Sequence, residues 1–180
     1  LSERASYDFL SQLYNRSTFE RELKSEIERS AHSKVAVLFI DVDDFKFIND
    51  RFGHSVGDEV IKYVAGCIKQ RVKGSGFAGR FGGDEFVLCI TDPKQIEEIE
   101  SLSLDLIDEL YERYHSELAN VSINVKASIG IAFYPEHGDD SNKVVAAADE
   151  AMYFVKKNGK ANYHIYQPED SEMEDLQHTL

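Results

Sequence analysis

The chain has 180 residues, 42% of them hydrophobic, and carries a formal net charge of −13 at pH 7. This length and apolar content suit one globular domain with a sizeable core and exclude a largely disordered chain. The excess of acids argues against a general nucleic-acid-binding or anionic-membrane-binding protein, because both kinds of partner attract basic surfaces.

The sequence contains no apolar run of membrane-spanning length and no signal-peptide pattern. We therefore expect a cytoplasmic domain that makes no membrane contact through this segment. The two cysteines, Cys67 and Cys89, lie among apolar residues, which favours buried free thiols in a reducing compartment.

Residues 1–30 are predicted to be helical, with a break near residues 14–16. Asn15 or Ser17 would cap the second of the two helices, because short polar side chains accept hydrogen bonds from the first free amides of a helix. Apolar residues recur at four-residue spacing in this second helix and form one stripe: Phe19, Leu23 and Ile27.

Residues 35–40 read Val-Ala-Val-Leu-Phe-Ile, which is typical of a strand buried on both faces. The run ends at Asp41, followed by Val42, Asp43 and Asp44. A carboxylate at the end of a central strand is held rigidly at the rim of the sheet. This position suits a ligand of Mg²⁺, which prefers hard oxygen atoms. The same acids would alternatively cap the helix that follows.

Two polar residues after this strand have the chemistry to recognise guanine. The carboxylate of Asp58 can accept from guanine N1–H and from the exocyclic amine at once, and adenine offers no such pair of donors; the amide of Asn49 can bond the remaining edge. A buried Asp58 left without donors would cost about 1–3 kcal/mol. As alternatives, Asn49 would be a turn cap, Asp58 a charge at a helix start, and His54 a structural histidine.

A helix is predicted over residues 57–71, followed by a break at residues 73–76. Apolar stretches flank a Gly-Gly pair at residues 82–83, which predicts two strands joined by a type I′ or II′ turn, because such turns need the positive φ that glycine supplies. Asp84 and Glu85 follow at once. Adjacent carboxylates repel each other, so their place at a hairpin tip favours a bound cation.

The remaining elements are predicted as a long helix within residues 92–115, a strand at residues 125–133, a helix over residues 145–155 closed by Gly159, and an edge strand at residues 163–166. Helices thus alternate with antiparallel hairpins. This order predicts an α+β fold in which helices flank one central, mostly antiparallel sheet.

Residues 80–86 read Arg-Phe-Gly-Gly-Asp-Glu-Phe, which is letter for letter the signature of the GGDEF family, the diguanylate cyclases. Residues 8–16 are similar to the family's opening motif, Asp-x-Leu-Thr-x-Leu-x-Asn-Arg, with Ser11 in place of Thr. Residues 41–58 resemble the motif that runs from the first strand into the guanine site. Residues 148–162 resemble the closing Ala-Asp-x-Ala-Met-Tyr-x-Ala-Lys motif. Together these matches extend over most of the chain.

The resemblance implies a palm-like core of the nucleotidyl cyclase kind, in which the strand that ends at Asp41 lies beside the hairpin that carries Asp84 and Glu85. It implies that two molecules of GTP condense into cyclic di-GMP with release of pyrophosphate. One domain holds one GTP, so the active site would form between two domains of a homodimer. Two Mg²⁺ ions per site, or Mn²⁺, would be held by Asp41, the Val42 carbonyl, Asp84 and Glu85.

The resemblance also assigns roles to individual side chains. Asp84 is implied as the proton acceptor, and Glu85 and Lys46 as the other catalytic residues. The implied substrate-binding residues are Phe45, Asn49, His54, Asp58, Lys156 and Lys160.

Lys156 and Lys160 match the family's two cationic positions for the triphosphate, and they would alternatively be ordinary lysines that complement a helix dipole. Lys160 stands where Arg is usual, so a bidentate fork becomes a point charge. In many family members an Arg-x-x-Asp motif upstream of the hairpin binds product and inhibits. Here Lys73 and Gly76 occupy those positions, and we predict weak or absent product inhibition.

Three other functions are considered. A silent GTP-binding module would regulate an attached domain, but the intact acids at residues 84–85 and Lys46 argue against it. A cyclase for other nucleotides is disfavoured by Asp58. A structural domain with only surface acids is disfavoured by the joint match of separate motifs.

We assign residues 16–166 to the GGDEF domain. Because the chain begins with Leu1, residues 1–15 are interpreted as a linker helix from an upstream sensor domain. Residues 167–180 contain five acids and no Lys or Arg and are interpreted as an acidic tail, either a linker or a solvated helix. A phosphodiesterase domain downstream is left open.

Overall fold

The computed structural model describes residues 6–29, 33–112 and 114–171. The elements, in chain order, are α1 (Arg16–Arg29), β1 (Val35–Val42), α2 (Phe45–Phe52), α3 (His54–Val72), β2 (Gly76–Arg80), β3 (Glu85–Thr91), α4 (Ile96–Tyr111), β4 (Tyr114–Ser116), β5 (Val121–Ile123), β6 (Ala127–Tyr134), α5 (Ser141–Lys157) and β7 (Tyr163–Ile165).

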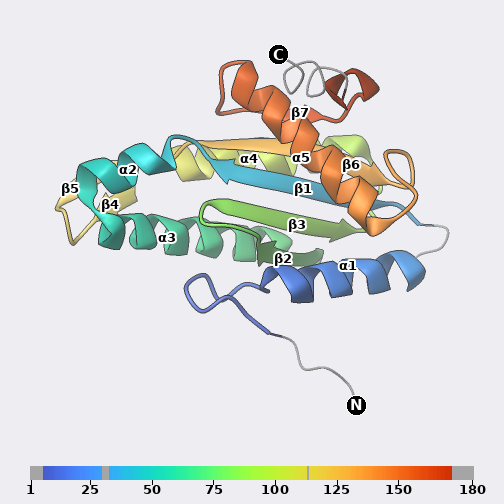
Figure 1. The fold of residues 1–180 in the computed structure, drawn as a ribbon, viewed down its shortest axis with the longest axis horizontal. Coiled ribbons are helices and arrows are strands. Elements are labelled where there is room, and N and C mark those ends of the chain that lie inside the picture. Colours follow the sequence, from blue (N-terminus) through green and yellow to red (C-terminus); the bar gives the residue numbers. More distant parts are fainter. Residues whose placement is uncertain (1–5, 30–32, 113, 172–180) are drawn as a thin grey trace.

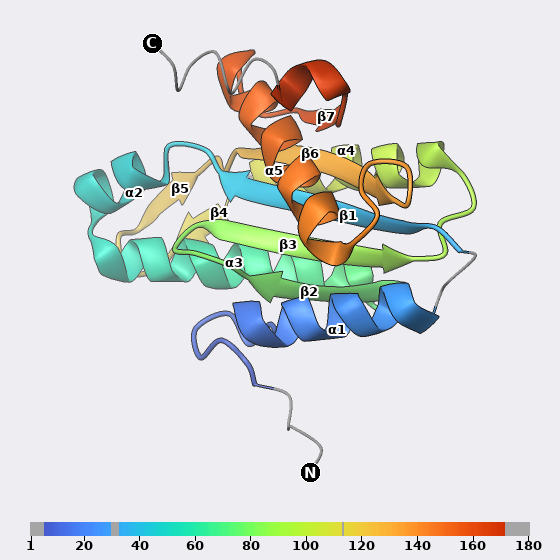
Figure 2. The ribbon, with the colours of Figure 1, turned by 45° about the vertical axis from the view of Figure 1, so that its right-hand side comes forward.

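A five-stranded sheet in the order β2-β3-β1-β6-β7 forms the centre of the domain (Figure 1), and β4 and β5 form a separate pair. Its strand pairs are antiparallel except for β6 with β7, which are parallel. Helices cover both faces: α5 crosses in front of the sheet in Figure 2, whereas α3 and α4 lie behind it. The predicted α+β fold with a central, mostly antiparallel sheet is confirmed.

Strand β1 lies in the middle of this sheet, between β3 and β6. Residues 35–40 are all buried, because one set of side chains faces α3 and α4 and the alternate set faces α1 and α5. The first set is Ala36, Leu38 and Ile40, and the second is Val35, Val37 and Phe39. Burial on both faces accounts for the unbroken apolar run.

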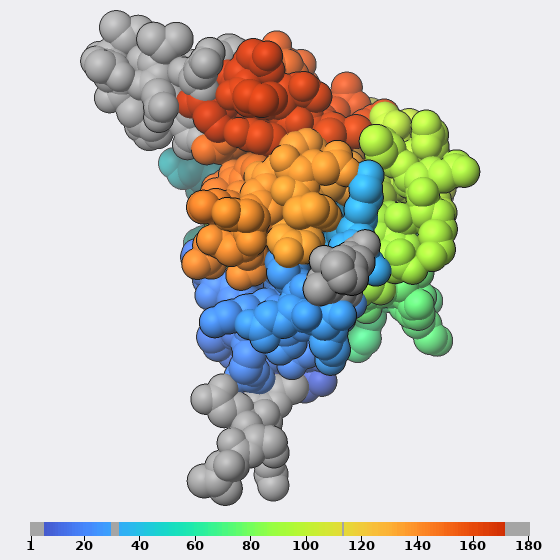
Figure 3. Space-filling model, turned by 90° about the vertical axis from the view of Figure 1, so that its right-hand side faces the viewer, coloured from blue at the N-terminus to red at the C-terminus, as the bar shows by residue number. Residues whose placement is uncertain are grey.

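Figure 3 shows one end of this layered arrangement. The blue surface of α1 lies against the orange segment that leads into α5, and the yellow-green start of α4 lies on the other side of the light-blue start of β1. Helices α1 and α5 are in contact, so they cover the same face of the sheet together.

The helices after β1 differ slightly from prediction. The helix predicted over residues 57–71 begins earlier, at the start of α3, and Gly53, with φ +92°, forms the corner between α2 and α3. Gly159 has φ +106° and follows the end of α5, which confirms its predicted role in closing that helix. Strand β7 lies at the sheet edge, as predicted.

The helix predicted at the N-terminus is wrong for residues 6–15, and residues 1–5 lie outside the described part. The Gln12 amide donates to the Asp8 carbonyl (2.9 Å), and the positive φ of Gln12 (+63°) turns the chain back. Tyr14 then forms a bridge with β2. The segment is therefore a turn attached to the sheet edge. The predicted cap is confirmed for Asn15, whose side-chain oxygen accepts a hydrogen bond from the Thr18 amide (2.9 Å).

The prediction of a linker or a solvated helix after β7 is right in part: residues 168–171 are helical and residues 167–169 are exposed, but Asp170 is buried. Residues 172–180 lie outside the described part. The Asp170 carboxylate is buried: it accepts from the Gln167 amide (2.8 Å) and lies 3.1 Å from His164 Nε2. The chain therefore stays attached to the domain for several residues after β7.

Both cysteines are free thiols, as predicted; Cys89 is buried and Cys67 is half-buried. Among the helices of the described residues, none has the length and apolar character needed to cross a membrane.

Candidate active site

The ends of three neighbouring strands bring acidic groups together. Asp41, near the end of β1, lies directly opposite Glu85 of β3 and Ser128 of β6. Directly opposite residues point to the same face of a sheet, which here is the face covered by α1 and α5. The Val42 amide donates to the Asp84 carbonyl (3.1 Å). The predicted adjacency of the first strand and the hairpin is confirmed.

The Asp41 carboxylate is in an unfavourable environment for a negative charge. Its Oδ1 atom is buried without a hydrogen-bond partner among the described residues. Burial first, and then the carboxyl groups of Asp84 and Glu85, raise the pKa of Asp41 to about 8, and Lys156 opposes the rise. Burial and the charge of Asp84 also raise the pKa of Glu85, and Arg16 opposes that rise.

A divalent cation fits this place, because an unpartnered buried carboxylate oxygen beside a second carboxylate is the donor set that Mg²⁺ prefers. Within the described ranges no group of three or more His, Cys, Asp or Glu side chains is arranged to hold a metal by itself. The fit therefore rests on Asp41 and Asp84, with further oxygen ligands from the backbone or from a bound phosphate.

The hairpin tip is built differently from the predicted glycine turn. The loop between β2 and β3 spans residues 81–84, and neither Gly82 nor Gly83 has a positive φ. The two glycines differ in their surroundings. A Cβ on Gly82 would lie 2.9 Å from Glu85 Oε1, whereas a Cβ on Gly83 would meet nothing within 4 Å. Gly83 therefore leaves the tip open to a ligand.

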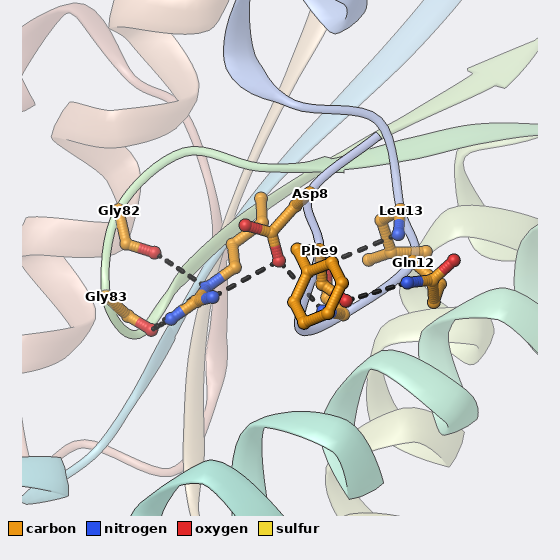
Figure 4. A network of polar contacts seen from close by, with 8 residues as sticks. Asp8, Phe9, Gln12, Leu13, Gly82 and Gly83 are labelled. Atoms are coloured by element: carbon orange, nitrogen blue, oxygen red, sulfur yellow. Dashed lines mark hydrogen bonds and ion pairs between the residues drawn. The ribbon is translucent and has the colours of Figure 1, made fainter. Parts of the chain in front are cut away.

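Arg80 links this loop to the N-terminal turn; Figure 4 labels Asp8, Gly82 and Gly83, which these contacts join. Its Nε donates to the carbonyls of Gly82 (3.1 Å) and Gly83 (3.2 Å), its Nη2 donates to Gly83 (2.7 Å), and its Nη1 lies 3.2 Å from Asp8 Oδ2. Ser11 donates its amide to the same Asp8 oxygen (2.8 Å). Burial alone would raise the pKa of Asp8, but the hydrogen bonds from Ser11 and Arg80 outweigh it and lower the pKa. The N-terminal turn thus braces the loop that presents the two acids.

Two cations from the end of α5 reach the acids that follow β1. Lys156 Nζ lies between Asp43 Oδ1 (2.5 Å) and Asp41 Oδ2 (3.6 Å). Lys160 Nζ lies 2.8 Å from Asp44 Oδ1, and both side chains of this pair are exposed. The hydrogen bond from Lys160 lowers the pKa of Asp44. The two lysines predicted for the triphosphate therefore lie together, beside the predicted metal ligands.

Asp43 is a site residue that sequence reasoning missed. Its side chain is fully buried and bonds three groups from distant parts of the chain. Ser128 Oγ (2.7 Å) and Lys156 Nζ share Oδ1, and the Ala161 amide donates to Oδ2 (2.9 Å). The spacing Asp-x-Asp after a buried strand is the sequence signal for this residue, but its partners lie 85 to 118 residues further along the chain.

The predicted guanine residues lie on α2 and α3. A Cβ on Gly57 would come within 1.9 Å of Asn49 Oδ1 and 3.3 Å of the Phe45 ring, so Asn49 lies against α3 only because residue 57 is glycine. His54 and Asp58 are exposed on α3. The expectation of a buried Asp58 is therefore wrong, because Asp58 is exposed while its neighbours Val56 and Val60 are buried. The cost of leaving Asp58 without donors is smaller than expected. Lys46 is exposed on the first turn of α2.

A pocket of about 370 Å³ lies between α1 and α5, next to the acids. Its walls include Arg16, Phe81, Glu85 and Asp149. The Arg16 guanidinium carbon lies 5.0 Å from the centre of the Phe81 ring. This face of the sheet is therefore open beside Glu85.

Comparison with known proteins identifies the family. The family model described as "Diguanylate cyclase, GGDEF domain" matches residues 5–162. The chain is 30% identical to the cyclic di-GMP phosphodiesterase PdeR of Escherichia coli (92% of this chain, 24% of PdeR) and 33% identical to the bifunctional diguanylate cyclase/cyclic di-GMP phosphodiesterase MucR of Pseudomonas aeruginosa (93% and 24%). Among solved structures, the GGDEF domain of TpbB (YfiN) from Pseudomonas aeruginosa superposes with a TM-score of 0.89 at 30% identity, covering 94% of this chain and 99% of that one. The chain spans about a quarter of the length of these two curated relatives.

Proposed function

The chain belongs to the GGDEF family, and from this premise we propose that it condenses two molecules of GTP into cyclic di-GMP with release of pyrophosphate. The observation that carries the proposal is the buried, unpartnered Oδ1 of Asp41, directly opposite Glu85 and beside Asp84. Such a group of carboxylates is costly unless a cation joins it.

Asp41, the Val42 carbonyl, Asp84 and Glu85 would hold two Mg²⁺ or Mn²⁺ ions. When bound, these ions would acidify the attacking hydroxyl and neutralise charge on the triphosphate. The raised pKa of Asp41 supports this assignment, because a nearby divalent charge would favour the ionised carboxylate that the protein alone disfavours.

The side chains of the domain bind the nucleotide and move the proton. Asn49 and Asp58 would read the guanine edge, with Phe45 and His54 beside them. Lys156 and Lys160 would bind the triphosphate, and Lys46 would stabilise charge that develops on the transferred phosphoryl group. These groups place the α-phosphate near the acids at the strand ends.

In the reaction, the 3′-oxygen of one GTP forms a bond to the α-phosphorus of the other. The bond from that phosphorus to the bridging β-phosphate oxygen breaks, and pyrophosphate leaves. The proton of the 3′-hydroxyl passes to Asp84. In the second step, the 3′-oxygen of the other nucleotide forms a bond to the α-phosphorus of the first. A second pyrophosphate leaves, and the ring is closed. Because one domain would hold one GTP, two copies must face each other, and we propose a homodimer as the active form.

The test is to incubate purified protein with GTP and Mg²⁺ and to separate the products by chromatography. We expect one cyclic di-GMP and two pyrophosphates for every two GTP consumed, and we expect Asp84→Ala to abolish both. The matched control is Asp108→Ala, an exposed acid on α4, which should leave the rate unchanged. Equal rates for the wild type and Asp84→Ala would sink the assignment.

A second candidate is a domain that binds GTP without turning it over and regulates an attached domain. It is favoured by the similarity to PdeR, which is named as a phosphodiesterase and matches over only a quarter of its length. The same incubation separates the two functions. GTP that binds to the protein but is recovered unchanged would support this second candidate.

A further inference from the structure

The carboxylate of Asp43 lies where four segments meet. It follows β1, and its two oxygens bond Ser128 of β6, Lys156 of α5 and the Ala161 amide in the loop before β7. Its own amide donates to the carbonyl of Lys126 (2.8 Å). The side chain is fully buried, whereas the side chain of Lys156 is 19% exposed. The buried anion thus holds a cation whose side chain is partly exposed.

All three groups that bond the Asp43 side chain can act as donors, and the ammonium and the amide can act only as donors. A carboxylate satisfies all of them, whereas an amide of the same shape would turn its NH₂ group toward at least one. A buried charge of this kind is tolerated because it is paired and hydrogen-bonded. Asp43 is therefore specific in charge as well as in size.

Lys156 lies within ion-pair distance of two acids and is closer to Asp43 than to Asp41. Lys156 Nζ lies 3.6 Å from Asp41 Oδ2, close enough to pair with it fully if Asp43 were neutral. Asp43 also accepts a hydrogen bond from the amide of Ala161, which follows Lys160 in the chain. Ala161 (φ +49°) and Lys160 (φ +61°) both have a left-handed backbone conformation. Non-glycine residues hold this conformation only where the surroundings impose it.

We infer that Asp43 is a positioning residue for triphosphate binding, which fixes the ammonium of Lys156 closer to itself than to Asp41 and so in place for the phosphates. The inference rests on the proposed function, because it takes the triphosphate of GTP as the ligand of Lys156. Asp43 does not touch the nucleotide and acts through Lys156.

The test compares equilibrium binding of GTP and GMP, each with Mg²⁺, to the wild type and to Asp43→Asn. We expect GTP to bind about tenfold more weakly to the variant, a change of about 1.4 kcal/mol, and GMP to change by less than about twofold. Ser128→Ala is the matched control, because it removes a neutral hydrogen-bond donor to Asp43 Oδ1 and leaves the ion pair of Asp43 with Lys156. This variant should bind GTP less than about threefold more weakly than the wild type. Equal losses for GTP and GMP would overturn the inference.

A double-mutant cycle tests the route of action. In a Lys156→Met background, Asp43→Asn should weaken GTP binding further by less than about threefold. A full tenfold loss in that background would show that Asp43 does not act through Lys156.

Failures of the two proposals can be told apart. A wild type that binds GTP and makes no cyclic di-GMP contradicts the cyclase and leaves the binding comparison intact, whereas a wild type that binds neither nucleotide overturns both proposals. If Asp43→Asn does not fold, ¹⁵N NMR of the wild-type lysine ammonium groups supplies the test. We expect the Lys156 signal to keep its coupling to the Asp43 carboxylate when GTP binds, and loss of that coupling would contradict the inference.

Discussion

Asp41 on β1 and Glu85 on β3 are paired directly across the sheet, so two acids that are distant in the sequence share one face at the end of adjacent strands. Burial first, and then the neighbouring carboxyl groups of Asp84 and Glu85, make the charge of Asp41 sensitive to pH in the metal-free protein. The pKa of Asp41 rises from its ordinary 3.8 to about 8 on folding. The folded state therefore binds more protons than the unfolded state between these values, and stability falls as pH rises through this window.

The first prediction follows from this sign. Without metal, the melting temperature of the wild type should fall between pH 5 and pH 8 more steeply than that of Asp41→Asn, which has no proton to lose. Thermal unfolding in a chelator, with both proteins scanned in the same buffers, measures the difference. Parallel curves for the two proteins would show that Asp41 is not perturbed.

The second prediction concerns the brace on the hairpin loop. Arg80→Gln removes the hydrogen bonds to the Gly82 and Gly83 carbonyls and the ion pair with Asp8. We expect a loss of about 1–3 kcal/mol in unfolding free energy and a fall in turnover of up to about 100-fold, because small displacements of catalytic groups are costly. Arg29→Gln, which breaks an exposed pair with Glu26, should change stability by less than about 0.5 kcal/mol. Equal losses of unfolding free energy and turnover in the two variants would show that Arg80 does not stabilise the loop.

The third prediction uses two glycines of the same helix. Gly57→Ala would place a Cβ 1.9 Å from Asn49 Oδ1, whereas Gly66→Ala would meet nothing within 4 Å. We expect Gly57→Ala to weaken GTP binding by about tenfold by displacing the Asn49 amide. Gly66→Ala should keep the affinity and gain about 0.5–1 kcal/mol of stability, because alanine is the better helix former. Calorimetric titration with GTP measures both, and unchanged affinity in Gly57→Ala would remove Asn49 from the guanine site.

The fourth prediction concerns product inhibition. The position that carries Asp in the inhibitory motif is Gly76, where an added Cβ would come within 1.8 Å of the Cys89 carbonyl of β3. An Asp side chain does not fit there without moving the strand. We therefore expect initial rates to be unaffected by micromolar cyclic di-GMP, and Gly76→Asp to lose about 1–3 kcal/mol or more of stability without gaining inhibition. A sharp fall of wild-type initial rates at micromolar product would contradict this.

Sequence reasoning predicted those parts of the structure that local pattern determines. The buried run at residues 35–40 identified the central strand, and the acid at its end identified one side of the site. Residues 6–15 form a turn and not the predicted helix, because the positive φ of Gln12 and the attachment of Tyr14 to β2 depend on tertiary contacts that local pattern does not show.

The roles of Asp43 and Arg80 were missed for a related reason. Asp43 is separated by 85 residues from Ser128 and by 113 from Lys156, and Arg80 by 72 from Asp8. Nothing in the local sequence shows such partners. The Gly-Gly pair is correctly identified, but neither glycine has a positive φ, and an added Cβ would come close to another side chain, that of Glu85, only at Gly82.

The most direct test of the central claim is the rate of cyclic di-GMP formation from GTP and Mg²⁺ as a function of protein concentration. If two domains that each hold one GTP at Asp41 and Asp84 form the active site, product appears, and the rate per domain rises with concentration until the dimer is complete. GTP that remains unconsumed at every protein concentration would contradict the claim.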